Sequence, residues 1–100
     1  MTSVTAIDGN NRNVPLKITD IGDGGVGLSS KAELTVGDRL SFGLQLTGTA
    51  RPIQVRARVV WTREYGTAGC EFLSMPPVDR DILREWLKGK AYVKKPLISV

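Results

Sequence analysis

The chain has 100 residues, of which 41% are hydrophobic and 24% are charged, and its formal net charge is +4. This length and balance indicate one compact domain, and they exclude a disordered chain, a repeat array and a membrane-spanning helix of about 20 apolar residues. The chain has no histidine and one cysteine, which excludes histidine-based catalysis, histidine or thiolate zinc sites and an internal disulfide.

The first three quarters of the chain consist of short strand-like segments separated by turn residues. Apolar and polar residues alternate with the period of two that predicts a β-strand, as at Val14, Leu16 and Ile18. Pro15 is typical of an edge strand or of the first residues of a strand pairing. Over the whole chain, the predicted strands cover residues 3–8, 14–21, 26–30, 39–46, 53–62 and 67–73.

The segment 53–62 has the clearest strand pattern in the chain. Arg56 and Arg58 lie on its polar face, and we expect them to point outward, as we expect of Lys17 on an earlier strand. The residues expected to face the core are Ile53, Val55, Ala57, Val59 and Trp61. Six such strands within about 70 residues predict a mainly β fold, a small six-stranded antiparallel barrel.

The hydrophobic period changes after residue 76. Apolar residues then recur at helical spacing, with Pro77 suited to a first turn and Gly89 at the expected end. The expected apolar face comprises Val78, Ile82, Leu83, Trp86 and Leu87, and the expected surface charges are Asp79, Asp81 and Glu85. We therefore expect one C-terminal helix that caps the barrel within residues 1–89, followed by a basic tail over residues 90–100.

The segment ITDIGDGGVGLSS, residues 18–30, contains four glycines within six positions. Glycine permits backbone angles that other residues avoid, and it lets other atoms come close to the main chain. The segment is therefore either a tight turn or part of a binding site. Cys70 lies in an apolar, strand-like stretch, where a thiol is expected to act as a small hydrophobic side chain.

Three stretches together resemble the PilZ domain: DIGDGGVGL at residues 20–28, VRARVVWTREYGTAGCEFL at residues 55–73, and DRDILREWL at residues 79–87. The resemblance extends from about Val4 to Lys88. PilZ domains are six-stranded barrels with a terminal helix, and many bind the bacterial second messenger cyclic di-GMP. The resemblance therefore implies this fold and a regulatory, nucleotide-binding role.

The signature of that family has two parts, and the chain carries one of them in altered form. The pattern D/N-x-S-x-x-G matches at Asp20 and Gly25, with Gly22 at the serine position. The other part, an R-x-x-x-R pair just before the first strand, is not present, because no residue precedes Met1 and Arg12 follows the first strand. Either the chain is part of a longer protein or it lacks the main phosphate contact of the family.

The resemblance implies that cyclic di-GMP contacts Asp20, Gly22 and Gly25. A carboxylate accepts hydrogen bonds from guanine N–H groups, and two phosphates require cations, so Arg56 and Arg58 are candidates to replace the missing pair. In the alternative interpretation, the glycines form only a turn and the arginines lie on a solvated barrel face.

Three functions are compatible with these features. The first is a cyclic di-GMP receptor module that passes the signal to a protein partner, and the second is a PilZ-like adaptor that binds proteins without the nucleotide. The third is a small basic barrel that binds nucleic acid, although the basic residues Lys88, Lys90, Lys94 and Lys95 lack interleaved aromatic residues other than Tyr92. We expect no enzymatic activity and no cofactor, and a chain without a secretory leader predicts a cytoplasmic protein.

Overall fold

The computed structural model describes residues 2–98, with side chains described as far as Gly89. The elements in chain order are β1 (Thr2–Asp8), β2 (Asn13–Ile21), β3 (Gly25–Ser29), β4 (Arg39–Leu44), β5 (Ile53–Thr62), the short 3-10 helix η1 (Glu64–Gly66), β6 (Thr67–Ser74) and the helix α1 (Pro77–Ile98). In this part of the chain, no helix has the length and apolar character of a membrane span.

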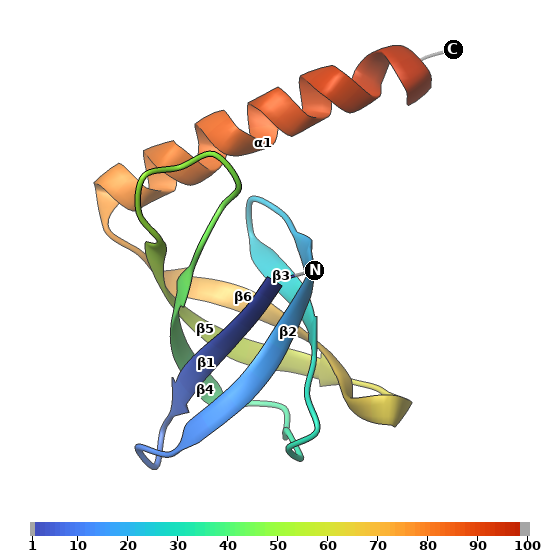
Figure 1. The fold of residues 1–100 in the computed structure, drawn as a ribbon. Coiled ribbons are helices and arrows are strands. Elements are labelled where there is room, and N and C mark those ends of the chain that lie inside the picture. The colour runs from blue at the N-terminus through green and yellow to red at the C-terminus, as the bar shows by residue number, and fades with distance from the viewer. Residues whose placement is uncertain (1, 99–100) are drawn as a thin grey trace.

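The six strands form a closed antiparallel barrel in the order β1-β2-β3-β6-β5-β4, and α1 lies across one end of it (Figure 1). The predicted fold class is therefore confirmed. Pro15 lies opposite Thr5 of β1, two residues before Lys17, where β2 begins to pair with β3. Its position thus agrees with the expected start of a pairing, although β2 is an interior strand of the closed barrel.

The core is formed by the inward faces of the strands. Except for Trp61, the alternating residues predicted to face the core are buried there, namely Val14, Leu16, Ile18, Ile53, Val55, Ala57 and Val59. Phe42, Leu44 and Leu46 are buried with them. Cys70 is also buried, and desolvation raises the pKa of its thiol to about 11. The thiol is therefore protonated at neutral pH and acts as a small hydrophobic side chain, as expected.

Helix α1 contacts the barrel through one face of its first three turns. Leu83 is fully buried, and Ile82 and Leu87 pack against the core. The indole Nε1 of Trp86 donates a hydrogen bond to the carbonyl of Thr47 at 3.1 Å, which confirms its expected role between barrel and helix. Val78, by contrast, was predicted to lie on this face but is 61% exposed, at the second residue of α1.

Asp79 is not the surface charge expected from the sequence, since its side chain is 1% exposed. Its carboxylate accepts hydrogen bonds from the backbone N–H of Gln54 at 2.7 Å and from the guanidinium of Arg51 at 2.7 Å. These two donors hold the pKa of Asp79 below its ordinary value. The helical pattern could not predict this burial, because the donors belong to a loop residue 28 positions earlier and a strand residue 25 positions earlier.

The helix also continues past Gly89, where we expected it to end, since α1 runs from Pro77 to Ile98. A glycine inside a helix costs only about 1 kcal/mol relative to alanine, so it does not oblige a helix to stop. The side chains of the predicted basic tail, residues 90–100, lie outside the described part of the structure.

Two β-bulges change which side chains face outward. In the first bulge, β5 has one additional residue between Val59 and Trp61, which pair with the adjacent residues Cys70 and Gly69. In the second, β6 has one additional residue, Leu73, opposite the step from Arg56 to Ala57. An additional residue reverses the alternation of side chains beyond it. Trp61 is therefore 41% exposed on the outside of the barrel instead of in the core, where strict alternation had placed it.

Candidate functional site

The turn between β2 and β3 contains the glycines that matched the family pattern. The N–H of Gly22 donates to the carbonyl of Gly25 at 2.9 Å, which closes the turn, and the N–H of Phe72 donates to the carbonyl of Gly24 at 2.9 Å. A Cβ atom added at Gly25 would overlap the backbone carbonyl of Cys70. Gly25 is thus required by the close approach of β3 to β6, whatever the turn binds.

A row of four residues crosses the outer face of the barrel next to this turn. Asp20 pairs with Gly27, Gly27 with Gly69, and Gly69 with Trp61, so that the row crosses β2, β3, β6 and β5. We call these four residues the glycine row. The side chains at the two ends of the row lie over the glycines, on the outside of the barrel. A Cβ atom added at Gly27 would lie 2.9 Å from Oδ2 of Asp20, and one added at Gly69 would overlap the indole of Trp61.

In the glycine row, the absence of side chains at Gly27 and Gly69 lets an acid and an aromatic ring lie directly over the main chain. Neighbouring strands lie about 4.8 Å apart, so the Asp20 carboxylate and the Trp61 indole are separated by about one strand spacing. Asp20 is exposed, and its Oδ2 accepts a hydrogen bond from Oγ1 of Thr19 at 3.0 Å. The carboxylate keeps further lone pairs for N–H donors of a ligand.

Arg63 adds a cation to the aromatic end of the row. Its guanidinium carbon lies 4.7 Å from the centroid of the Trp61 ring, at cation–π distance, so the indole is held between Gly69 and Arg63. Within residues 2–98, Arg63 forms no ion pair with a described carboxylate. Its planar charge is therefore available to a phosphate or a base.

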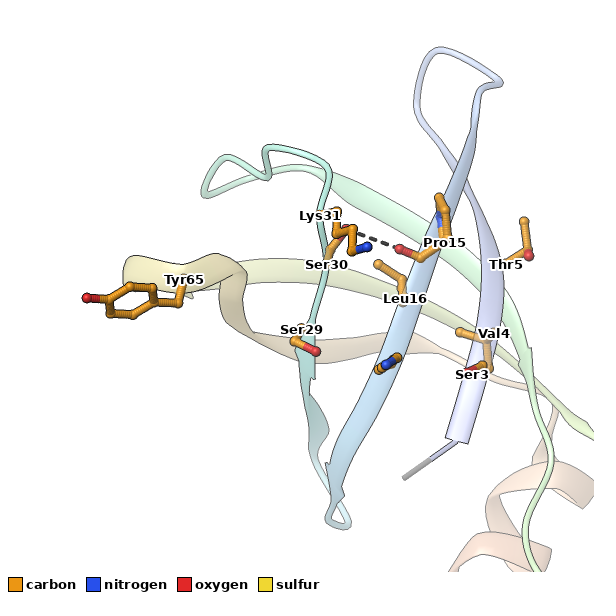
Figure 2. Close-up of a pocket in the computed structure, with 10 residues that line it drawn as sticks. Ser3, Val4, Thr5, Pro15, Leu16, Ser29, Ser30, Lys31 and Tyr65 are labelled. Carbon is orange, nitrogen blue, oxygen red and sulfur yellow. Dashed lines mark hydrogen bonds between the residues drawn. The ribbon is translucent and has the colours of Figure 1, made fainter.

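A groove of about 520 Å³ continues this face across β1, β2 and β3. Its lining includes the cations Lys17 and Lys31 and the hydroxyls of Ser3 and Ser29. Figure 2 labels Ser3, Ser29 and Lys31 in this groove. Lys17 lies opposite Ser29, the outward pair next to Asp20 and Gly27, so the groove adjoins the glycine row. The Tyr65 ring at the rim points away from the strands and is 96% exposed.

The residues predicted from the sequence fall into three places. Asp20 lies in the glycine row, and Gly22 and Gly25 lie in the adjacent turn. Arg58 lies near that turn, but its guanidinium is paired with Glu71, the residue opposite Gly25. Arg56 faces Ser41 and Ser74 further along β5, away from the row.

Of the glycine row and the neighbouring arginine, only Asp20 was a predicted site residue. The others were not: Gly27, Gly69, Trp61 and Arg63. Trp61 was assigned to the core because strict alternation hides a bulge, and Arg63 lies in a turn. A glycine inside an otherwise regular strand, as at Gly69, indicates a bulge or a close approach of other atoms. That signal could have placed the Trp61 ring outside the barrel.

The turn is also connected to the helix. Arg80 of α1 donates to the carbonyl of Asp23 at 2.6 Å, and Nε of Arg84 lies 3.7 Å from Oδ1 of the same residue. Arg80 and Arg84 therefore both contact Asp23. Asp20 is the exposed carboxylate of the glycine row. In the described residues, no group of three or more acidic or cysteine side chains is placed to hold a metal ion.

Comparison with known families gives one match. The family model described as the PilZ domain matches residues 1–89, a range that covers the whole barrel and the first turns of α1. No curated protein matches the chain.

Proposed function

The chain belongs to the PilZ domain family, and from this membership we propose that its glycine row binds cyclic di-GMP. Members of this family are in general binding and regulatory modules for that nucleotide rather than enzymes. In this proposal the chain is a receptor module that passes the signal to a partner protein. The cytoplasmic location predicted from the sequence is part of the same proposal.

The observation that supports the proposal most is the pair of facing glycines, Gly27 and Gly69, between an exposed carboxylate and an indole. A guanine base is planar, and the groups it can reach on this face are the exposed Asp20 carboxylate and Trp61 indole, which lie over the two glycines. The Asp20 carboxylate is then an acceptor for the guanine N–H groups, and the Trp61–Arg63 pair is a surface for stacking.

The cations nearest to this face differ from those predicted from the sequence. Arg63 lies over Trp61, and Lys17 lies one outward pair from Asp20, whereas Arg58 is paired with Glu71 and Arg56 lies away from the row. Charge-assisted bonds to phosphate are roughly twice as strong as neutral ones. With Arg63 and Lys17 in place of a signature arginine pair, we expect micromolar or weaker affinity.

An arginine pair placed before β1 would have a natural position in this geometry. Thr2, the first residue of β1, lies opposite Ile18, two residues before Asp20. Residues that precede Thr2 in a longer chain would thus approach the Asp20 end of the glycine row, from the side of β2 on which β1 lies. A chain extended by such residues, if they include arginines, is expected to bind cyclic di-GMP more tightly.

Titration calorimetry with cyclic di-GMP tests the proposal directly. Asp20→Ala and Trp61→Ala are each expected to weaken binding at least about tenfold, since each removes one end of the row. Arg58→Ala is expected to have a smaller effect, because its charge is already paired with Glu71. Arg56→Ala is the matched control and is expected to bind like the unchanged chain.

Two outcomes contradict the proposal. If Arg56→Ala abolishes binding while Trp61→Ala leaves it unchanged, the nucleotide binds elsewhere on the barrel. If neither this chain nor the longer one releases or absorbs heat at high protein concentration, the domain does not bind cyclic di-GMP. The protein-interaction adaptor is then the better assignment.

A further inference from the structure

A second outer face of the barrel, formed by β4, β5 and the end of β6, carries three arginines. Arg39 lies directly opposite Arg58, and Arg56 lies opposite Ser41. Like charges placed directly opposite on neighbouring strands destabilise a sheet. This arrangement is therefore unfavourable for the isolated fold, apart from the bond that Arg58 makes with Glu71.

Two of these arginines converge on a small pocket. Arg39 and Arg56 line a hollow of about 170 Å³ together with the hydroxyls of Ser41 and Ser74 and the side chain of Leu73. We call these five residues the arginine pocket. Within residues 2–98, neither Arg39 nor Arg56 forms an ion pair with a described acidic side chain.

The arginine pocket also contains an apolar contact. Leu73 is the additional residue of the bulge in β6, and it is 42% exposed next to the two arginines. Bulges often redirect a side chain toward a functional surface. The pocket therefore offers two guanidinium groups, two hydroxyls and one aliphatic group, which matches an acidic side chain next to an aliphatic one.

A wider groove of about 660 Å³ adjoins the arginine pocket and shares Ser41, Arg56 and Ser74 with it. It lies along the seam between β1 and β4, which pair only at Ile7–Ser41 and Asp8–Leu40. Beyond these two pairs the strands are not paired with each other, so an extended chain can follow the seam.

We propose that the arginine pocket and this groove bind an extended, acidic segment of a partner protein. A carboxylate of the segment lies between Arg39 and Arg56, a neighbouring aliphatic side chain contacts Leu73, and the backbone follows the seam. A nucleic acid fits less well, because the lining of the arginine pocket contains no aromatic side chain on which a base could stack. The assignment is independent of cyclic di-GMP binding, because the glycine row lies on a different part of the barrel.

The test is a titration of the full chain, followed through its backbone amide resonances by NMR, with a short peptide of alternating glutamate and leucine. The expected result is saturable shifts at Ser41, Arg56 and Ser74. Arg39→Gln and Arg56→Gln are each expected to weaken binding about tenfold, since each removes a charge-assisted hydrogen bond. Arg63→Gln, next to Trp61 of the glycine row, is the matched control and is expected to leave the affinity for the peptide unchanged.

Three results would overturn the proposal. The first is a peptide with lysine in place of glutamate that binds equally well, and the second is the absence of saturable shifts at the pocket. The third is a single-stranded oligonucleotide that shifts the same resonances at lower concentration, with an affinity that falls steeply with salt. Well-dispersed spectra of each variant establish that the barrel is folded, so a loss of binding reports on the pocket.

Discussion

The two outer faces of the barrel share strands β5 and β6 but are built in different ways. The glycine row depends on the backbone, because its floor is Gly27 and Gly69 and its shape follows from residues that lack side chains. The arginine pocket depends on side chains, because Arg39 and Arg56 form its charged walls. In both places a β-bulge turns an apolar side chain outward, Trp61 in one and Leu73 in the other.

This difference indicates how each face responds to mutation. On a surface shaped by the backbone, an added side chain displaces the groups that lie over the glycine. Where those groups belong to the main chain, it also disrupts the pairing of the strands. A surface formed by exposed side chains loses its ligand and leaves the fold intact, because exposed substitutions seldom change the free energy of unfolding by more than about 0.5 kcal/mol.

The largest effect is expected for Gly25→Ala. The new Cβ would overlap the carbonyl of Cys70, and neither backbone can move without breaking the pairing of β3 with β6. We expect a loss of about 3 kcal/mol or more in the free energy of unfolding, measured by urea denaturation. Gly43→Ala in β4 is the control, because its Cβ would have its nearest neighbour at 3.5 Å. Equal stability of the two variants would contradict this view of the glycine turn.

Asp79→Asn is expected to have the next largest effect, because Asp79 is a buried polar contact between α1 and the start of β5. Loss of its charged hydrogen bonds is expected to cost about 1–3 kcal/mol at pH 7. Asp23→Asn, which removes only exposed ion pairs between the glycine turn and α1, is expected to cost less than about 1 kcal/mol. A larger cost for Asp23→Asn would mean that the helix depends mainly on the glycine turn.

The pH dependence of stability should follow from the same carboxyl group. The N–H of Gln54 and the guanidinium of Arg51 lower the pKa of Asp79 in the folded chain. Its contribution to the free energy of unfolding is therefore fully present above the unfolded-state pKa of about 3.9. That contribution is lost as the pH falls through the lower folded-state pKa. The difference in melting temperature between the unchanged chain and Asp79→Asn should therefore shrink in acid. A difference that grows in acid would contradict this assignment.

Gly69→Ala is expected to reduce stability by about 1 kcal/mol, because the new methyl group displaces a side chain and leaves the backbone in place. The indole N–H resonance of Trp61 should shift in the NMR spectrum, and cyclic di-GMP binding should weaken. Peptide binding at the arginine pocket should not change. A change in both affinities would indicate that the two faces are coupled.

The smallest effect is expected for Arg58→Gln. This change removes an exposed ion pair with Glu71, and it also removes the like charge opposite Arg39. The two effects oppose each other, so we expect a change within about 0.5 kcal/mol that disappears at high salt. A loss that persists at high salt would mean that Arg58 has a structural role.

Much of the fold was predictable from local patterns. Alternation at Val14, Leu16 and Ile18 placed one face of a strand in the core, and the change of period after residue 76 located α1 at Pro77. These patterns succeed because burial follows the periodicity of a single element. The glycine turn between β2 and β3 was predictable from residue type, since glycine is the residue that permits close backbone approach.

The sequence alone therefore determined the barrel, its helix and the family to which the chain belongs. Only the tertiary structure decided which side chains meet outside the core. Trp61 reached the surface through a bulge that depends on the partner strand, and Asp79 was buried by donors from a distant loop and strand. Arg58 was paired with Glu71, while Arg63 was placed over Trp61. Each of these outcomes depends on contacts between separate elements, which the periodicity of one element does not contain.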